Sequence, residues 1–251
     1  MSLLSPRVRI ALTPGRVAVA SGRDYRDAEV AEPGWTGALK ALSSLLAGAG
    51  LQGRTSVILS HDFAPVHLIP SPPVLLKPAE TEGWVRDHLS RQFGDAAREW
   101  RIAWQPVPPG EAIVAGSLEP AQLAELEAAI RAMSLKPAEV QPWLAVAWNR
   151  QRRRIGKGRA WFALAEPGRL TLAGLEDGRV RCLRSAQMQG DAAIALADLL
   201  KREALLAGET SPAPVWIESV LPSVNWQGIS QGRAVHTVAG GSKALTALLE
   251  H

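Results

Sequence analysis

The chain has 251 residues, a length that allows one or two domains of about 150 residues each. Its 47% apolar and 21% charged residues exclude an intrinsically disordered protein, and its single cysteine, Cys182, excludes an intramolecular disulfide and a cysteine-rich zinc site. No apolar run approaches the roughly 18 residues of a membrane helix, and the first ten residues lack the order of a signal peptide. We therefore expect a reduced, cytoplasmic protein, with residues 249–251 as an affinity-tag remnant.

The positive charge is concentrated in one short segment. The net charge is +4, and the chain would be slightly acidic without Arg150, Arg152, Arg153, Arg154, Lys157 and Arg159. This basic segment contains no aromatic residue on which a base could stack, which argues against a specific nucleic-acid site. We interpret it first as the solvated carboxyl end of a helix. An acidic partner or anionic lipid is the second interpretation, and nucleic acid is the third.

Apolar runs and leucine spacings predict alternating strands and helices in the first part of the chain. The predicted order is strands 7–12, 16–21 and 25–30, helix 34–49, strand 55–60, helix 78–93, strands 100–105 and 111–116, and helix 120–134. Four prolines between residues 65 and 73 predict a loop, because proline can continue neither a helix nor a central strand.

The second part repeats the opening of the first. After a helix at 143–153, the prediction is strands 161–166, 169–175 and 179–184, helix 190–207, and strands 214–219 and 234–238. The turn Pro14-Gly15-Arg16-Val17 recurs as Pro167-Gly168-Arg169-Leu170, between the first and second strands of each part. Because similar turns occupy the same place in two similar element orders, we predict two α/β lobes of related topology.

Several segments resemble a known family. Glu80 lies in a helix that ends at Phe93-Gly94, and Trp100 opens the next strand. Pro142-Trp143 stands at the lobe junction, before Trp148-Asn149-Arg150. The chain resembles the actin-like (ribonuclease-H-like) proteins PilM and MshI of type IV pili and the cytoplasmic part of GspL of type II secretion. The resemblance implies two actin-like lobes with mixed sheets flanked by helices, over residues 1–140 and 141–248.

In nucleotide-binding members of this fold, the two hairpin tips hold phosphate, and the first tip carries an Asp and a Gly. This chain has Ala11 and Thr13 at those places, followed by Pro14, Gly15 and Arg16. The second tip, with Glu166, Gly168 and Arg169, also lacks a glycine-rich run. We therefore expect a pseudo-ATPase with no catalytic residues, no metal and no cofactor, and interpret Arg16 and Arg169 as ordinary surface arginines. A nucleotide-binding ATPase or small-molecule kinase is the alternative.

The resemblance implies a scaffold at the cytoplasmic face of a pilus or secretion platform, peripheral to the inner membrane. Such a domain binds a short cytoplasmic segment of an inner-membrane partner and can contact the assembly ATPase. We place the binding groove around residues 65–73 and helix 78–93, with Trp84, His88 and Trp104 as candidate contacts, because tryptophans often dominate binding interfaces. A nucleic-acid-associated protein using residues 150–159 is a further alternative.

Overall fold

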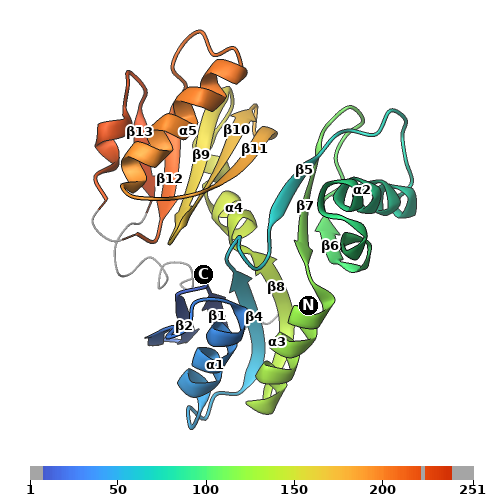
Figure 1. The fold of residues 1–251 in the computed structure, drawn as a ribbon, viewed down its shortest axis with the longest axis vertical. Helices are drawn as coiled ribbons and strands as arrows, with labels where there is room; N and C mark the ends of the chain where they lie inside the picture. The colour runs from blue at the N-terminus through green and yellow to red at the C-terminus, as the bar shows by residue number, and fades with distance from the viewer. Residues whose placement is uncertain (1–7, 222–223, 239–251) are drawn as a thin grey trace. The chain divides into compact units, whose positions relative to one another are not determined.

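The computed structural model describes residues 8–221 and 224–238 (Figure 1). The tag interpretation for residues 249–251 lies outside this range. Contacts divide the chain into two compact units, with the boundary between Ala145 and Val146, and each unit is described by itself. The boundary predicted from the sequence follows residue 140. No helix in the described part of the chain has the length and apolar character needed to span a membrane.

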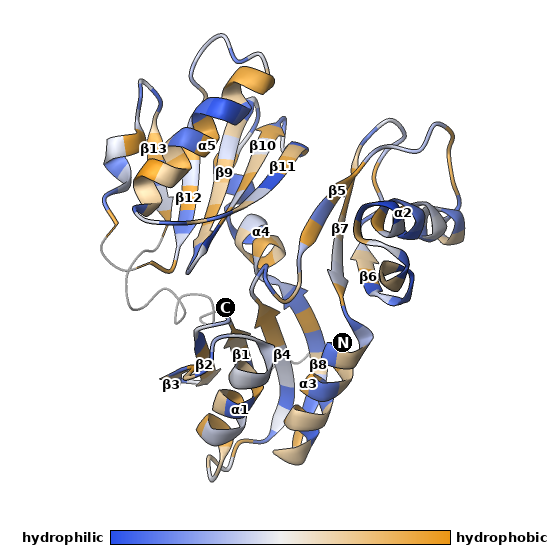
Figure 2. Cartoon of the chain, in the orientation of Figure 1, coloured by the Kyte–Doolittle hydropathy of each residue, from blue (hydrophilic) through white to orange (hydrophobic). Residues whose placement is uncertain are grey.

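A five-stranded mixed sheet with strand order β3-β2-β1-β4-β8 forms the base of the first unit. Its strands are β1 (Val8–Leu12), β2 (Arg16–Ser21), β3 (Asp24–Glu29), β4 (Gly53–Leu59) and β8 (Leu135–Pro142). Strand β1 runs antiparallel to β2 and parallel to β4. The helices α1 (Trp35–Leu46) and α3 (Pro120–Ala132) bury leucine and isoleucine side chains against the sheet. The apolar carboxyl end of β4 is orange in Figure 2 and is buried over residues 55–59.

A smaller layer is inserted between β4 and α3. Its sheet has the order β5-β7-β6, and its elements are β5 (Val66–Ile69), α2 (Pro78–Phe93), the 3₁₀ helix η1 (Asp95–Glu99), β6 (Arg101–Trp104) and β7 (Ile113–Leu118). The backbone N–H of Ser117 donates to the carbonyl oxygen of Pro65 at 3.0 Å, which joins the two ends of the insertion. Ile69, Val85, Leu89 and Ile113 form its own buried core.

Two strands differ from the sequence-based prediction, and proline explains both. The expected loop over residues 65–73 contains β5, so that prediction was wrong for residues 66–69. Pro65 and Pro70 flank β5, which is an edge strand, so neither proline removes a donor from the ladder. Strand β8 was not predicted, because Pro137 and Pro142 interrupt its pattern; it also lies at a sheet edge.

The second unit repeats the first sheet. The helix α4 (Trp143–Ile155) leads into strands β9 (Arg159–Glu166), β10 (Arg169–Glu176) and β11 (Arg179–Gln187), followed by helix α5 (Ala192–Leu206), strand β12 (Val215–Ser219), the 3₁₀ helix η2 (Trp226–Ile229) and strand β13 (Val235–Val238). The order β11-β10-β9-β12-β13 again places the first strand between its hairpin partner and a parallel fourth strand. The predicted fold of two related mixed α/β sheets flanked by helices is confirmed.

Gly174 on β10 marks a close approach of three elements. A Cβ atom at this position would lie 2.6 Å from Sγ of Cys182 and 2.9 Å from Cζ3 of Trp161. Both neighbours are side chains of the adjacent strands β11 and β9, so a methyl group at this position would force them out of their present packing.

We expect Gly174→Ala to lower the free energy of unfolding by about 1–3 kcal/mol through overpacking. Chemical denaturation checks this value. Gly228→Ala in the same unit is the matched control, because nothing lies within 4 Å of a Cβ there, and it should change stability by less than about 0.5 kcal/mol. Equal effects of the two substitutions would contradict the close-approach argument.

Candidate functional site

The tip of the β1–β2 hairpin closes on itself. Thr13 is buried; its backbone N–H and its hydroxyl both donate to the carbonyl oxygen of Arg16, at 2.9 and 2.8 Å. The backbone N–H of Arg16 donates back to Oγ1 of Thr13 at 2.9 Å. Pro14 has no N–H to offer. The turn therefore uses internally two of the three backbone donors between residues 13 and 16.

The Arg16 side chain is also engaged within the first unit. Its Nε donates to Oδ2 of Asp27 on β3 at 2.7 Å, and its Nη2 forms an ion pair with the same oxygen. Ala11, which we compare on sequence grounds with the Asp of nucleotide-binding members, is buried in β1 and offers only a methyl group. A guanidinium held by a carboxylate attracts a phosphate less strongly than a free one, because its charge is already compensated.

The two hairpin tips are pinned by equivalent hydrogen bonds. The carbonyl oxygen of Gly15 accepts from the N–H of Val30 at 3.0 Å, and that of Gly168 accepts from Met188 at 2.8 Å. Val30 and Met188 each follow the third strand of their unit directly. The internal repeat thus extends from the turn residues to the bonds that fix the turns.

The second tip places a buried carboxylate beside a basic residue. Glu166 is buried at the end of β9 and lies directly opposite Arg169 in the strand register. Nη1 of Arg169 donates to the hydroxyl oxygen of Ser185 on β11 at 3.1 Å. In the part of the chain that the structure describes, no three His, Cys, Asp or Glu side chains are grouped so that they could hold a metal ion.

The inserted layer carries an aromatic cluster that the sequence did not reveal. The ring of His67 lies 5.1 Å from that of Phe93 and 6.5 Å from that of Trp100, measured between centroids. Nε2 of His67 lies 2.9 Å from the hydroxyl of Ser117. Burial lowers the pKa of His67 to about 4, so the imidazole is neutral at physiological pH. His67 has a packing role in this cluster.

Two of the three predicted partner-binding residues lie together. The rings of Trp84 and His88 on α2 are 4.4 Å apart, and Nδ1 of His88 lies 2.9 Å from the carbonyl oxygen of Trp84. Nε1 of Trp84 donates to the carbonyl oxygen of Pro70 at 2.9 Å. Trp104, on β6, packs partly buried against the core of the same layer. Trp84 therefore fastens the loop that precedes α2.

That loop exposes two apolar side chains. Val74 is 64% exposed and Leu75 is 80% exposed. Trp84 holds the start of the loop at Pro70, and Glu80 accepts a hydrogen bond from the N–H of Lys77 at its end, at 2.7 Å. Prolines 70, 72 and 73 further restrict the chain. The loop is thus a short apolar projection fixed at both ends to α2, whose residues are mostly hydrophilic and drawn in blue in Figure 2.

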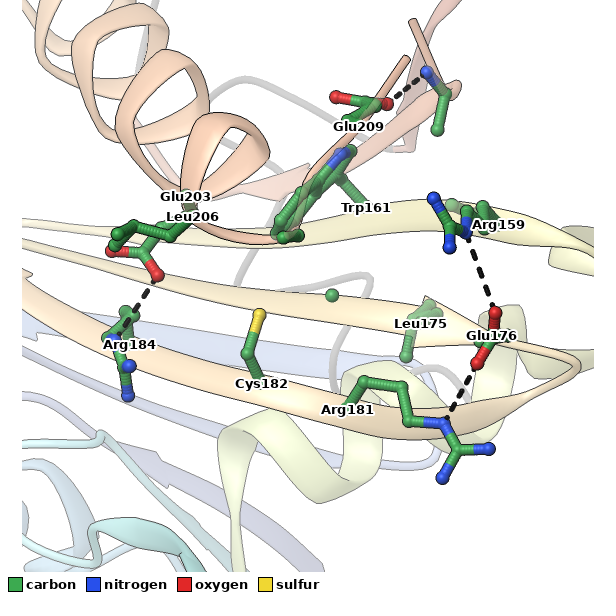
Figure 3. A pocket seen from close by; sticks show the side chains of 14 residues that line it. Arg159, Trp161, Leu175, Glu176, Arg181, Cys182, Arg184, Glu203, Leu206 and Glu209 are labelled. Atoms are coloured by element: carbon green, nitrogen blue, oxygen red, sulfur yellow. Dashed lines mark hydrogen bonds and ion pairs between the residues drawn. The ribbon is translucent and has the colours of Figure 1, made fainter. Parts of the chain in front are cut away.

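A pocket of about 420 Å³ lies in the second unit between the end of α5 and the sheet (Figure 3). Trp161, Cys182 and Leu206 contribute to its lining. Its charged groups are paired: Arg184 with Glu203 at 3.2 Å, and Arg181 and Arg159 with Glu176 at 3.2 and 3.5 Å. Burial raises the pKa of the Cys182 thiol, which keeps it protonated and a poor nucleophile.

The first unit has a similar hollow of about 490 Å³ between β3 and α1, with Ala28 and Ala41 in its lining. The two hollows are not equivalent, because the first lies along α1 and the end of β3, whereas the pocket beside Cys182 also reaches β9, β10 and the last turn of α5. The arginines of that pocket are paired with carboxylates and its thiol is protonated, so it is a weaker candidate site than the loop before α2.

The predicted basic segment does not form one surface. Arg150 turns inward; its side chain is 18% exposed and its Nη1 lies 3.5 Å from Oε1 of the buried Glu218 on β12. Arg159 pairs with Glu176. The other four residues, Arg152, Arg153, Arg154 and Lys157, are exposed. The inclusion of Arg150 was therefore wrong, because a carboxylate distant in sequence holds it.

Comparison with solved structures identifies the fold. The PilM–PilN type IV pilus biogenesis complex matches with a TM-score of 0.68 and 13% identity, over 93% of this chain and 89% of that chain. The chain has an actin-like fold. The cytoplasmic domain of EpsL, an inner-membrane component of the Vibrio cholerae type II secretion system, matches with a TM-score of 0.59 and 13% identity, covering 96% and 93% of the two chains.

A Bacteroides thetaiotaomicron protein with an actin-like ATPase fold and unknown function matches with a TM-score of 0.61 and 7% identity, covering 98% and 97%. No protein-family model and no curated protein matches the chain. The predicted structural resemblance to the PilM and GspL type of actin-like protein is confirmed at the level of the fold.

The half-buried His67 predicts a pH dependence of stability. Because the pKa of His67 is about 4 in the folded protein and near 6.5 when unfolded, the unfolded chain takes up the extra proton between these values. Above about pH 6.5 His67 is neutral in both states and does not lower the free energy of unfolding. As the pH falls from 6.5 towards 4, protonation of the unfolded chain lowers the free energy of unfolding. By pH 5 the loss should be about 1–2 kcal/mol.

Urea denaturation between pH 7.5 and 5 measures this loss. His67→Gln removes the titrating group, so the variant should lose less stability over the same pH interval than the wild type. Identical pH profiles for the two proteins would show that another group accounts for the dependence.

Proposed function

We propose that this protein is a non-catalytic, actin-like scaffold of a type IV pilus or type II secretion platform. In this role it lies at the cytoplasmic face of the inner membrane and binds a cytoplasmic segment of a membrane partner. The observation that carries the proposal is the likeness to the PilM–PilN complex, with a TM-score of 0.68 over 93% of the chain. The likeness to the cytoplasmic domain of EpsL supports the same cellular setting.

The closed tip of the first hairpin supports a scaffold without ATP turnover. Phosphate binding in a hairpin tip needs several backbone N–H groups pointing at one anion. In the first tip Thr13 and Arg16 use theirs within the turn, Pro14 lacks one, and Asp27 compensates Arg16. A nucleotide-binding ATPase is the alternative that the next experiment tests.

We expect no change in thermal stability when saturating Mg-ATP is added. A ligand at about 100 times its Kd adds roughly 2.7 kcal/mol, which would raise the Tm of a protein of this size by about 5–10 °C. A thermal melt with and without millimolar Mg-ATP measures the shift. A rise of that size would contradict the pseudo-ATPase, and ATP hydrolysis lost in Glu166→Gln would then identify an enzyme.

The loop before α2 is the surface we propose for the partner segment. Among the described residues of the first unit, Val74 and Leu75 are the most exposed large apolar residues. Trp84 and Glu80 fix the loop at both ends, so little conformational entropy is lost when a partner packs against it. In this role Trp84 positions the loop through its hydrogen bond to Pro70, His88 packs against Trp84, and Val74 and Leu75 contact the partner.

Binding to the cytoplasmic segment of the membrane partner tests this surface. The probes are synthetic peptides of the cytoplasmic segments of the pilus and secretion inner-membrane proteins from the same organism. We expect one peptide to bind, and Val74→Ser with Leu75→Ser to weaken it at least tenfold through loss of two buried anchors. Isothermal titration calorimetry measures both affinities.

The matched control is Leu205→Ser with Leu206→Ser, which alters two adjacent exposed apolar residues of the second unit. This variant should bind like the wild type. Equal weakening by both double substitutions would contradict the assignment to the loop, and no binding by any peptide would contradict the scaffold proposal.

A further inference from the structure

Four neighbouring cations at the carboxyl end of α4 form an unusual surface. Arg152, Arg153 and Arg154 lie in the last turn of the helix, and Lys157 follows in the next loop; we call these four residues the α4 basic patch. All four side chains are exposed. Over residues 8–221 and 224–238, no carboxylate lies within 4.0 Å of any of them.

Six other arginines of the second unit form ion pairs with carboxylates. Glu203 is shared by Arg184 and Arg202, at 3.2 and 3.0 Å. Glu209 holds Arg233 at 3.3 Å, and both side chains are 7% exposed. The helix α4 itself contains no acidic residue. The α4 basic patch therefore differs from these paired arginines, because its four neighbouring cations have no carboxylate within 4.0 Å among the described residues.

The helix dipole explains only part of this concentration. The carboxyl end of a helix is equivalent to about half a negative charge, which favours one cation in the last turn. Three consecutive arginines followed by a lysine exceed that charge several-fold and repel one another. An array of anions outside the protein would compensate these positive charges and reduce their mutual repulsion.

The composition of the patch selects among anionic partners. The segment from residue 150 to 159 has no aromatic side chain for stacking on bases. Its only large apolar residue, Ile155, is half-buried, so it offers no exposed anchor of the kind that dominates protein interfaces. Guanidinium groups donate hydrogen bonds in a fork that matches phosphate.

We propose that the α4 basic patch binds the phosphate-bearing headgroups of anionic lipids. Each cation near an anionic membrane surface raises binding about fivefold, so the four together give a contact with a Kd of about 1 mM. Such a contact alone is too weak to hold a protein on a membrane. It becomes effective when a membrane partner already holds the chain nearby, and in this respect the inference rests on the proposed function.

Vesicle flotation with the whole chain tests the patch without any partner protein. The probes are vesicles of phosphatidylcholine alone and of phosphatidylcholine with about one third phosphatidylglycerol, at about 50 mM salt. We expect binding only to the anionic vesicles, and a decrease as salt rises because exposed charges are screened. Arg152→Gln, Arg153→Gln and Arg154→Gln combined should weaken binding about 100-fold.

Two control variants and a thermal melt distinguish an effect of the patch on vesicle binding from an effect of net charge or of misfolding. Arg23→Gln, Arg26→Gln and Arg101→Gln remove the same charge from three exposed arginines of the first unit and should leave binding within about threefold of wild type. Replacing Arg152, Arg153 and Arg154 by lysine keeps the charge and should retain most of the binding. A thermal melt establishes that each variant is folded.

The inference would be overturned if the protein did not bind anionic vesicles at low salt, or if the patch variant and the control lost binding equally. Displacement from the vesicles by a few millimolar inorganic phosphate would overturn it too, because it would indicate a site for the free ion. Stronger binding to an acidic peptide or to nucleic acid than to vesicles would also overturn it. Failure of the peptide experiment with successful vesicle binding would reject the proposed function and leave the lipid contact standing.

Discussion

Parallel pairing of the first and fourth strands is the constraint on which each unit depends. Parallel neighbours cannot be joined by a tight turn, so the chain must cross over through a helix, α1 or α5, which buries its apolar side on the sheet. The residue after the fourth strand then bonds to the end of the first: Ser60 N–H to Leu12 at 2.9 Å, and Val220 N–H to Ala165 at 3.2 Å. This crossover brings the hairpin tip to the carboxyl ends of the parallel strands, where ligands of open α/β sheets usually bind.

The same frame can therefore carry a nucleotide site or lack one, depending on a few residues at the tips. Here Thr13, Pro14 and Arg16 turn the first tip into a self-contained hydrogen-bonded turn. The likeness to the PilM–PilN complex and to the EpsL domain is a likeness of fold. In the proposed scaffold the loop before α2 meets a protein segment, while the α4 basic patch meets the membrane surface.

Local sequence patterns predicted the strands of both main sheets wherever apolar residues alternate without proline, and the recurring Pro-Gly-Arg turn predicted the repeat. Strands β5 and β8 were missed because prolines at their ends or within them suppress the strand signal, although an edge position tolerates them. The state of Arg150 depends on Glu218, which lies on another strand. The burial of His67 likewise depends on Phe93 and Trp100, so no pattern around residue 67 reveals it.

The hydrogen bond between Ser117 and Pro65 closes the inserted layer into a separable module. With its own core and with its two ends held together, the layer can change its sequence while the five-stranded sheet beneath keeps its contacts. If the proposed loop binds the partner, selection can act on recognition and on folding of the five-stranded sheet at different rates. The two junctions of an exchanged segment 65–117 would then lie side by side at this hydrogen bond.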